Sequence, residues 1–389
     1  MIPCRAMASQ PTPPASSQEP APAYRRRPGL AVRLIALGLS VLVALLLLEG
    51  AVRVRQWLRY GTSKAEAVEL VTDPATGLRI AKPNMDNGHV RTDSRGFRNP
   101  ELAMPKPSNR VRLAFLGGST TFCAEVSSND ATWPALVVRK IAARYPDVAF
   151  DFVNGGQPGY GTESSLKSLR LRIAPLQPDF VLYYEATNDL STDTRELARA
   201  RGLFHGDADK PSPLARVSSA YALVEKTLRY RSRSSGDASR PRLVYDADSL
   251  ARGFETRLVE LIRTARQTAP VCAIATFSHR VRRDQPPEVQ RQACESSLYY
   301  APYMSVPGLL DGWDAYNRAI AAAARETGAI LIGGEDAIPG DGEHFADSVH
   351  FRDAGSALMA DRVANALIAS PEFNRLVGTH RAGGKAPPS

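Results

Sequence analysis

Ser119, Asp347 and His350 are residue types that together could carry out acyl transfer. Ser119 follows the apolar run "LAFLGG", where a chain that looks like a buried strand turns toward a helix. A nucleophilic serine needs a base within hydrogen-bond reach and a third group that orients the base. His350 is the candidate base, and Asp347 precedes it by three residues, close enough on a turn to hold the imidazole. The pattern favours a nucleophile at Ser119 over a plain turn residue.

The same reaction needs hydrogen-bond donors aimed at the oxyanion that develops during attack. The candidates are the backbone N–H groups of Ser119 and of a glycine in "NGGQPGYG", and the side-chain amide of Asn188 in "ATND". Each segment also has an ordinary structural interpretation. Asn188 could end a strand in a simple turn, and Asp347 with His350 could form a hydrogen-bonded pair at a helix entry. Their occurrence in one chain favours the chemical interpretation.

A metal centre is the alternative interpretation of the histidine-containing end of this pattern. His344 lies six residues before His350, and with Asp347 these residues would offer three ligands. Zinc sites of known type use other spacings. The prediction is therefore that the site uses no metal and no cofactor.

Strands and helices are expected to alternate along the later part of the chain. Short apolar runs typical of buried strands alternate with longer segments whose apolar residues recur at helical spacing. The expected strands are residues 110–118, 148–156, 178–189, 270–278 and 329–334, and the expected helices are residues 132–145, 163–173, 248–267, 314–328 and 353–369. This alternation is typical of an α/β domain built on a parallel five-stranded sheet.

The candidate residues fall at one edge of that sheet. Ser119 follows the first strand, the glycine-rich loop follows the second, and Asn188 follows the third. Asp347 and His350 lie between the fifth strand and the last helix. Ligands of open parallel sheets bind at the carboxyl ends of the strands. The topology therefore predicts that these residues meet.

The ordered set of segments resembles the SGNH hydrolase superfamily, also called GDSL-type esterases. That family has a serine after the first strand, a glycine in an N-x-x-x-x-G loop after the second, an asparagine in G-x-N-D after the third, and D-x-x-H near the C-terminus. The resemblance implies a flavodoxin-like three-layer α/β/α fold and a serine esterase or acyltransferase. Over about residues 109–370, the matching positions are the catalytic Ser119, Asp347 and His350 and the oxyanion-hole residues Ser119, Gly159 and Asn188.

Two positions depart from the family's motifs. Gly118 stands where the family has an aspartate before the serine, and Ala186 stands where it has the glycine of G-x-N-D. Neither change removes a catalytic group, although Ala186 is expected to narrow the approach to the oxyanion site. The "GGST" form around Ser119 resembles membrane-anchored bacterial members. The G-x-S-x-G motif of α/β-hydrolases is absent from the sequence.

An apolar segment near the N-terminus, residues 28–52, predicts one transmembrane helix. It contains 15 uncharged residues from Leu34 to Leu48, and with its neighbours it reaches the roughly 20 residues that span a bilayer. An uncleaved anchor is favoured over a cleaved signal peptide, because Glu49 and bulky leucines occupy the place where small residues should precede a cleavage site. Basic residues on the two sides balance, so the positive-inside rule does not set the orientation.

The remaining segments differ from the predicted domain in composition. We expect a single-pass membrane protein whose catalytic domain is extracytoplasmic, in the periplasm. The predicted organisation is a disordered tail at 1–27, a connecting region at 53–108, the hydrolase-like domain at 109–372 with an insertion at about 190–246, and a flexible C-terminal tail at 373–389.

Charge and composition limit the kinds of binding partner that we expect. The net charge of +9 on 389 residues comes as scattered clusters without a nucleic-acid-binding motif, so no nucleic acid partner is predicted. The expected partners are an ester-bearing small molecule, lipid or glycan, and a membrane through the N-terminal helix. The sequence indicates no particular protein partner. Cys272 and Cys294 could form a disulfide in an oxidising compartment or remain thiols.

The sequence therefore predicts a serine esterase that works through an acyl-enzyme and removes acyl or acetyl groups from a glycan or a lipid. Two alternatives stay open at this point. One is an O-acyltransferase that acts on a cell-surface polysaccharide, and the other is an inactive glycan-binding or scaffold module.

Overall fold

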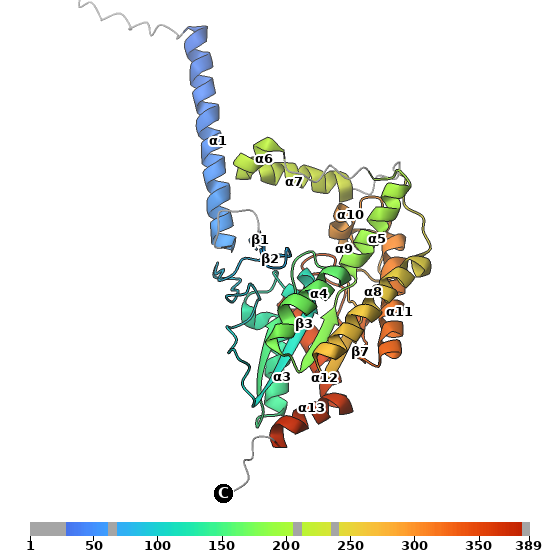
Figure 1. The fold of residues 1–389 in the computed structure, drawn as a ribbon. Helices are drawn as coiled ribbons and strands as arrows, with labels where there is room; N and C mark the ends of the chain where they lie inside the picture. The colour runs from blue at the N-terminus through green and yellow to red at the C-terminus, as the bar shows by residue number, and fades with distance from the viewer. Residues whose placement is uncertain (1–28, 61–67, 205–211, 235–240, 383–389) are drawn as a thin grey trace, which may run out of the picture. The chain divides into compact units, whose positions relative to one another are not determined.

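A long apolar helix, α1 (Leu30–Tyr60), begins the described part of the chain (Figure 1). The computed structural model describes residues 29–60, 68–204, 212–234 and 241–382, and it divides into one unit that ends at Leu48 and another that begins at Glu49. The stretch Leu30–Arg55 is long and apolar enough to cross a membrane, as predicted, although a signal sequence would meet the same test. The tail predicted to be disordered, residues 1–27, lies outside the described residues.

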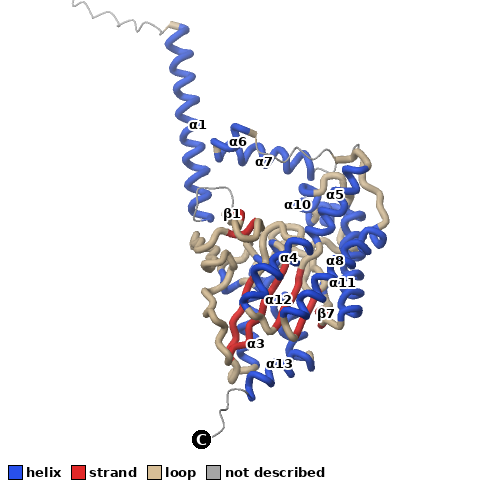
Figure 2. The backbone as a smooth tube through the Cα atoms, in the orientation of Figure 1, coloured by secondary structure: helices blue, strands red, loops and turns tan. Residues whose placement is uncertain are grey.

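Five parallel strands form the sheet at the centre of the second unit (Figure 2). Their order is β4-β3-β5-β6-β7, the flavodoxin-like order in which the first strand lies between the second and the third. In β3, Leu113 lies opposite both Phe152 and Phe180. The predicted five-stranded parallel sheet is confirmed. The strands are β3 (Arg110–Gly117), β4 (Ala149–Asn154), β5 (Phe180–Tyr184), β6 (Val271–Ala275) and β7 (Ile330–Ile332).

Helices cover both faces of the sheet, because right-handed connections that run in opposite directions along a sheet place their helices on opposite faces. Accordingly α3 packs against α12, whereas α8 packs against α4 and α11. This is the predicted three-layer arrangement. The α-helices are α2 (Ser119–Phe122), α3 (Trp133–Arg144), α4 (Thr162–Ser168), α5 (Thr187–Ala200), α6 (Pro213–Val217), α7 (Ser219–Ser234), α8 (Ala247–Thr268), α9 (Pro287–Ala293), α10 (Glu295–Tyr300), α11 (Val306–Thr327), α12 (Asp353–Ala369) and α13 (Pro371–Ala382). Short 3-10 or π segments are η1 (Asn129–Ala131), η2 (Leu169–Ile173), η3 (Ala174–Leu176) and η4 (Glu335–Ala337).

Local sequence explains why the main elements form. Residues 111–116 of β3 are buried throughout, as expected for a parallel strand that is covered on both faces. Helix α8 buries Phe254 and Leu258 at helical spacing. The side chain of Asp246 caps α8 by accepting a hydrogen bond from the Ser249 N–H.

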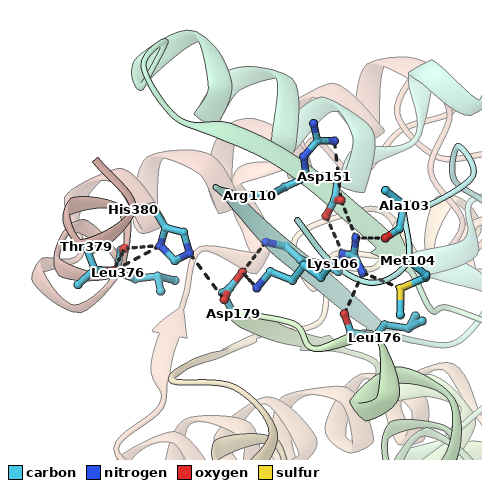
Figure 3. A network of polar contacts seen from close by, with 11 residues as sticks. Ala103, Met104, Lys106, Arg110, Asp151, Leu176, Asp179, Leu376, Thr379 and His380 are labelled. Carbon is cyan, nitrogen blue, oxygen red and sulfur yellow. Dashed lines mark hydrogen bonds and ion pairs between the residues drawn. The ribbon is translucent and has the colours of Figure 1, made fainter. Parts of the chain in front are cut away.

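A polar network at the amino ends of the strands joins segments that are far apart in the chain (Figure 3). Arg112 of β3 donates two hydrogen bonds of 2.8 Å to Asp151 of β4. Asp179, just before β5, accepts from the Arg112 backbone N–H at 2.7 Å and from the Lys106 ammonium. The ring of His380 in α13 lies 4.0 Å from Asp179. The network therefore fixes the start of the sheet, opposite the edge where the candidate residues lie.

The C-terminal segment is helical, which corrects the flexible tail predicted for residues 373–389. In α13 the side chains of Phe373, Leu376 and Val377 are buried. Phe373 meets the ring of Phe180 edge-on, with the centroids 5.6 Å apart. The apolar residues lie on one face of a short helix, and their burial against the sheet outweighs the polar composition that suggested a tail. Residues 383–389 lie outside the described residues.

Two segments that were predicted to be irregular contain regular structure. The predicted insertion at about 190–246 contains most of α5 and all of α6 and α7. The predicted connecting region, 53–108, contains the antiparallel pair β1 (Leu70–Thr72) and β2 (Arg79–Ala81), and its Phe97 belongs to the main core. Strands of three residues among polar turns carry no readable periodicity, which is why the pattern missed them.

Cys272 and Cys294 are free and buried, so they do not form the disulfide that the sequence left open. Burial raises the pKa of each thiol to about 12. Cysteines of this kind stay protonated and chemically inert. They contribute as small apolar side chains in the core.

Candidate active site

The turn after β3 explains the two glycines that precede Ser119. Gly117 has a φ of +154°, and a Cβ there would lie 2.2 Å from the Tyr184 carbonyl oxygen of the neighbouring strand. Only glycine fits that close approach of two backbones. Ser119 is the first residue of α2 and is half-buried. The N–H groups of a helix's first turn have no acceptor within the helix, so the Ser119 N–H is available to an external acceptor.

Ser119, His350 and Asp347 form one hydrogen-bonded series. The Nε2 atom of His350 lies 2.8 Å from the Ser119 Oγ, and its Nδ1 atom lies 2.8 Å from the Asp347 Oδ2. An ionised carboxylate can only accept, so the proton is assigned to Nδ1 and Nε2 is left to accept from the serine hydroxyl. The sequence predicted that these three residues meet, and the structure places them in direct contact.

The loop between β7 and α12 holds the imidazole in this position. The other carboxylate oxygen of Asp347 accepts from the backbone N–H groups of Val349 and His350, each at 2.9 Å. A backbone bond of 2.8 Å from Ala346 to the His350 carbonyl closes the turn. The ring of Phe351 then stacks on Tyr184 of β5 with a centroid separation of 6.3 Å. The turn is thus closed on itself and packed against the central sheet.

Carboxylates around His350 raise its pKa by more than burial lowers it. Burial lowers the pKa of the imidazole, but Glu125 and Asp347 raise it, and the net pKa is about 10. Burial raises the pKa of Asp347, but His350 and the backbone hydrogen bonds lower it to about 2 on balance. Asp347 is therefore ionised over the whole range in which His350 gains or loses its proton. The pair favours the imidazolium that forms when the histidine accepts a proton.

Of the predicted oxyanion donors, the Asn188 amide lies next to the turn that contains Ser119. The Asn188 side-chain amide donates to the Tyr160 carbonyl at 2.9 Å. An amide nitrogen carries two hydrogens, so one remains for a substrate oxygen. Gly159 is exposed with a φ of +84°, and a Cβ there would meet nothing within 4 Å. A Cβ on Gly118 would come within 2.6 Å of the Asn188 Nδ2, which places that amide beside the residue that precedes Ser119.

Hydrogen bonds join the loops that contain Gly159 and Asn188 to their neighbours. Asp189, which follows Asn188 in α5, accepts from the Thr162 backbone N–H at 2.9 Å, and this bond joins the loops after β4 and β5. Gln157 joins the loop after β4 to the chain before β3. Its side chain accepts from the Ala81 N–H at 2.7 Å and donates to the Gly96 carbonyl at 3.0 Å.

Three residues near the site were missed by the sequence reasoning. Gln157 supports the loop that contains Gly159, Glu125 raises the pKa of His350, and the fully buried Glu185 accepts from the Asn188 backbone N–H at 2.8 Å. Only Glu185 had a signal in the sequence, because an acidic residue directly follows the apolar run "FVLYY". Burying a charged side chain is costly unless it is paired or hydrogen-bonded, so an acid at the end of a buried strand indicates specific partners.

Within the described ranges, no group of three His, Cys, Asp or Glu side chains could hold a metal ion. His344, which the sequence reasoning considered as a ligand together with Asp347, is hydrogen-bonded to Asp341 at 2.8 Å. The Asp347 carboxylate is instead engaged with His350. These pairings give His344 a structural role in its own turn.

Comparison with known families agrees with this geometry. Residues 115–358 match the GDSL-like Lipase/Acylhydrolase family. The match covers more than half of the chain. The chain belongs to the GDSL-like lipase/acylhydrolase family. This GDSL-like acylhydrolase is accordingly a hydrolase of ester bonds, and a serine nucleophile is typical of its family.

Solved structures with a similar fold are distant in sequence from this GDSL-like acylhydrolase. The α/β hydrolase LAE5 from the metagenome of Lake Arreo is 14% identical over 69% of this chain and 95% of its own, with a TM-score of 0.39. The acetylxylan esterase Axe2 from Geobacillus stearothermophilus is 16% identical over 69% of this chain and 94% of its own, with a TM-score of 0.39. A lipase/acylhydrolase from Enterococcus faecalis is 16% identical over 66% of this chain and 95% of its own, with a TM-score of 0.39. No curated protein matches the chain.

The two departures from the GDSL motifs have different surroundings. Gly118 has no room for a side chain, since a Cβ would lie 2.3 Å from the Glu185 Oε2. Ala186 is fully buried and has a φ of −154°, so its methyl group fits the core without backbone strain. The narrowing of the oxyanion approach by Ala186 stays a prediction.

Proposed function

We propose that this GDSL-like acylhydrolase is a serine esterase that forms an acyl-enzyme on Ser119. The observation that carries the proposal is the hydrogen-bonded series from the Ser119 Oγ through His350 to Asp347, with 2.8 Å at both links. A serine hydroxyl is a weak nucleophile until an oriented base takes its proton. The series supplies both the base and the group that orients it.

In the acylation half-reaction, His350 Nε2 takes the Ser119 proton while the Oγ forms a bond to the ester carbonyl carbon. Asp347 stabilises the imidazolium that results. The tetrahedral intermediate then collapses, the bond to the leaving alkoxide breaks, and His350 returns the proton to that oxygen. In deacylation, His350 takes a proton from water, whose oxygen attacks the acyl carbon, and Ser119 leaves with that proton.

The oxyanion of each tetrahedral intermediate is held by three donors in this proposal: the backbone N–H groups of Ser119 and Gly159 and the side-chain amide of Asn188. The position of the Asn188 amide beside Gly118 supports this assignment. Loss of one such donor typically lowers kcat by about 10²–10³-fold.

The proposed substrate is an acyl or acetyl ester carried by a glycan or a lipid outside the cytoplasmic membrane. The helix candidate Leu30–Arg55 supports a membrane anchor, and we assign the catalytic domain to the extracytoplasmic side. If a sugar hydroxyl replaces water in the second half-reaction, the same residues make an O-acyltransferase. An inactive glycan-binding module is the remaining alternative.

A fluorophosphonate probe tests the proposal, because it modifies only a serine whose base is in place. Full-length protein should be labelled on Ser119, and the variants Ser119→Ala and His350→Ala should lose the label. Ser164→Ala, at a half-buried serine of α4, is the matched control and should label fully. Labelling that persists in Ser119→Ala, or is absent from the unmodified protein, would contradict the proposal.

Product analysis then separates hydrolysis from transfer. Acyl esters of increasing chain length are supplied with and without a polysaccharide acceptor. Release of free acid without acceptor supports the esterase. Transfer to the acceptor at the expense of hydrolysis supports the acyltransferase instead.

A further inference from the structure

A buried carboxylate lies beside the proposed nucleophile and takes no part in the reaction described above. Glu185 follows β5 directly, and its side chain is fully buried. Among the described residues no Lys, Arg or His side chain forms an ion pair with it. Burial of an acid without a cation in direct contact is costly. Burial raises the pKa of Glu185 to about 7 on balance, although two backbone hydrogen bonds and the charge of His350 lower it. A charge so placed needs a physical explanation.

The contacts of Glu185 join two loops of the site. One carboxylate oxygen accepts from the Asn188 backbone N–H at 2.8 Å and from the Ala186 backbone N–H at 3.1 Å. The other oxygen lies 3.4 Å from the hydroxyl of Thr120, the residue after Ser119. The carboxylate therefore lies between the segment that bears the nucleophile and the segment that bears the oxyanion amide.

Gly118 is what leaves room for this carboxylate. Its φ of −91° is one that any residue adopts, so glycine is not required here for backbone conformation. A Cβ at Gly118 would instead lie 2.3 Å from the Glu185 Oε2 and 2.9 Å from the Tyr160 carbonyl. The GDSL motif has an aspartate at this position, so in this chain the Glu185 carboxylate occupies the space where that side chain would begin.

We propose that Glu185 is a positioning residue of the esterase site, which fills the space left open by Gly118 and holds Asn188 in place for the oxyanion. The inference rests on the proposed esterase function. Asn188 is fixed from two sides, because Glu185 accepts from its backbone N–H and the Tyr160 carbonyl accepts from its side chain. Glu185 acts through Asn188 and needs no contact with the substrate.

This role predicts a particular kinetic effect. The oxyanion exists only in the transition state and the intermediates, so a misplaced Asn188 lowers kcat and leaves KM nearly unchanged. Glu185→Ala should lower kcat by about 10–100-fold, which is at most the smallest decrease in kcat expected when one oxyanion donor is removed. Glu185→Gln keeps an oxygen that can accept from both N–H groups, and it should recover most of that loss. Glu163→Gln, at an exposed acid of the same rim, should change neither constant.

A double-variant cycle tests whether Gly118 and Glu185 share one space. Gly118→Ala alone should lower kcat, because its methyl group would displace both the Glu185 carboxylate and the Asn188 amide. In the Glu185→Ala background the same change should lower kcat by a smaller factor than it does alone, since the clash with the carboxylate is gone and only the contacts with the Asn188 Nδ2 and the Tyr160 carbonyl remain. Contacting residues are expected to be non-additive in this way. Additive losses would overturn the shared-space argument.

The experiment measures kcat and KM for an acyl ester with the full-length protein and these variants, after fluorophosphonate labelling of the unmodified protein. The expected result is normal labelling, a kcat loss in Glu185→Ala and recovery in Glu185→Gln. If the unmodified protein labels and hydrolyses but Glu185→Ala keeps full kcat, or loses only through KM, the role of Glu185 is wrong and the esterase stands. If Glu185→Ala does not fold, the variants Glu185→Gln and Gly118→Ala test the role of Glu185. That role is wrong if Glu185→Gln loses as much kcat as Ser119→Ala does, or if Gly118→Ala loses none. No labelling of the unmodified protein overturns the proposed function itself.

Discussion

At the scale of single residues, the proposed reaction depends on the charge state of one imidazole. His350 must be neutral to take the Ser119 proton, and its pKa is raised above the ordinary 6.5 by Glu125 and Asp347 despite its burial. A raised pKa keeps the base protonated to higher pH. The acidic limb of the pH–rate profile therefore lies above the range of an ordinary histidine.

Glu125→Gln removes one of these negative charges. The pKa of His350 should fall, and the acidic limb of kcat/KM should move to lower pH. Glu125 is exposed, so solvent screens its charge and the shift is smaller than the loss of Asp347 would cause. The measurement is kcat/KM for an acyl ester across the acidic limb, with Glu163→Gln as control. A limb that moves to higher pH, or does not move, would contradict this electrostatic account.

The site residues could be predicted from the sequence where a motif and the strand order placed them at the same edge of the sheet. Ser119, Asp347 and His350 have types that suit one reaction, and the strand order brings their loops together. Glu185 and Gln157 could not be assigned in this way. Their partners are set by side-chain contacts between loops, and no spacing along the chain reveals those contacts.

At the scale of elements, the loop after β4 depends on a segment that the sequence treated as a mere connection. Gln157 binds Ala81 of β2 and Gly96 in the turn that follows. Since Gly159 and Tyr160 lie in the same loop, this support extends to the proposed oxyanion donors. Residues 68–108 of the predicted connecting region are therefore part of the domain that contains the site.

Gln157→Ala leaves a buried N–H at Ala81 and a buried carbonyl at Gly96 without this partner. Unsatisfied groups of this kind cost about 1–3 kcal/mol each, so unfolding by urea should occur at a clearly lower midpoint. The kcat should fall as well, because the loop that bears Gly159 loosens. Gln292→Ala, at an exposed glutamine, is the control and should leave both unchanged. Wild-type stability in Gln157→Ala would refute this account of the loop.

Phe373→Ala tests the helical C-terminus. Phe373 is fully buried and contacts Phe180 edge-on, and a phenylalanine in such a position typically contributes about 3–5 kcal/mol. The free energy of unfolding from denaturant titration should fall by that order. Val289→Ala, at an exposed side chain, serves as the control. A loss below about 1 kcal/mol would mean that the segment behaves as the tail that the composition suggested.

The five strands were predictable because each is a short apolar run, and the helices between them have strong apolar periodicity. Helix α13 was not predictable in this way, because its otherwise polar segment offers few apolar residues, among them Phe373, Leu376 and Val377. Their importance comes from the surface they cover, which only the folded sheet provides. The same holds for β1 and β2, whose three-residue strands are too short to show a period.

At the scale of the whole molecule, the chain joins a membrane-length apolar helix to an ester hydrolase domain. If α1 is an uncleaved anchor, the protein from cells should stay in the membrane pellet after alkaline carbonate extraction, and its N-terminal peptides should include residues 30–48. A fragment that lacks residues 1–52 should leave the pellet. Release of the full-length chain, or an N-terminus that begins after Glu49, would indicate a cleaved signal peptide.

Trapping of the covalent intermediate tests the central claim most directly. Full-length protein is mixed with an activated acyl ester, quenched in acid and digested, and the peptide that contains Ser119 is examined by mass spectrometry. We predict one acyl group on Ser119, absent from Ser119→Ala and strongly reduced in His350→Ala. Turnover of the ester with no acyl group on Ser119, or equal turnover by Ser119→Ala, would contradict the account.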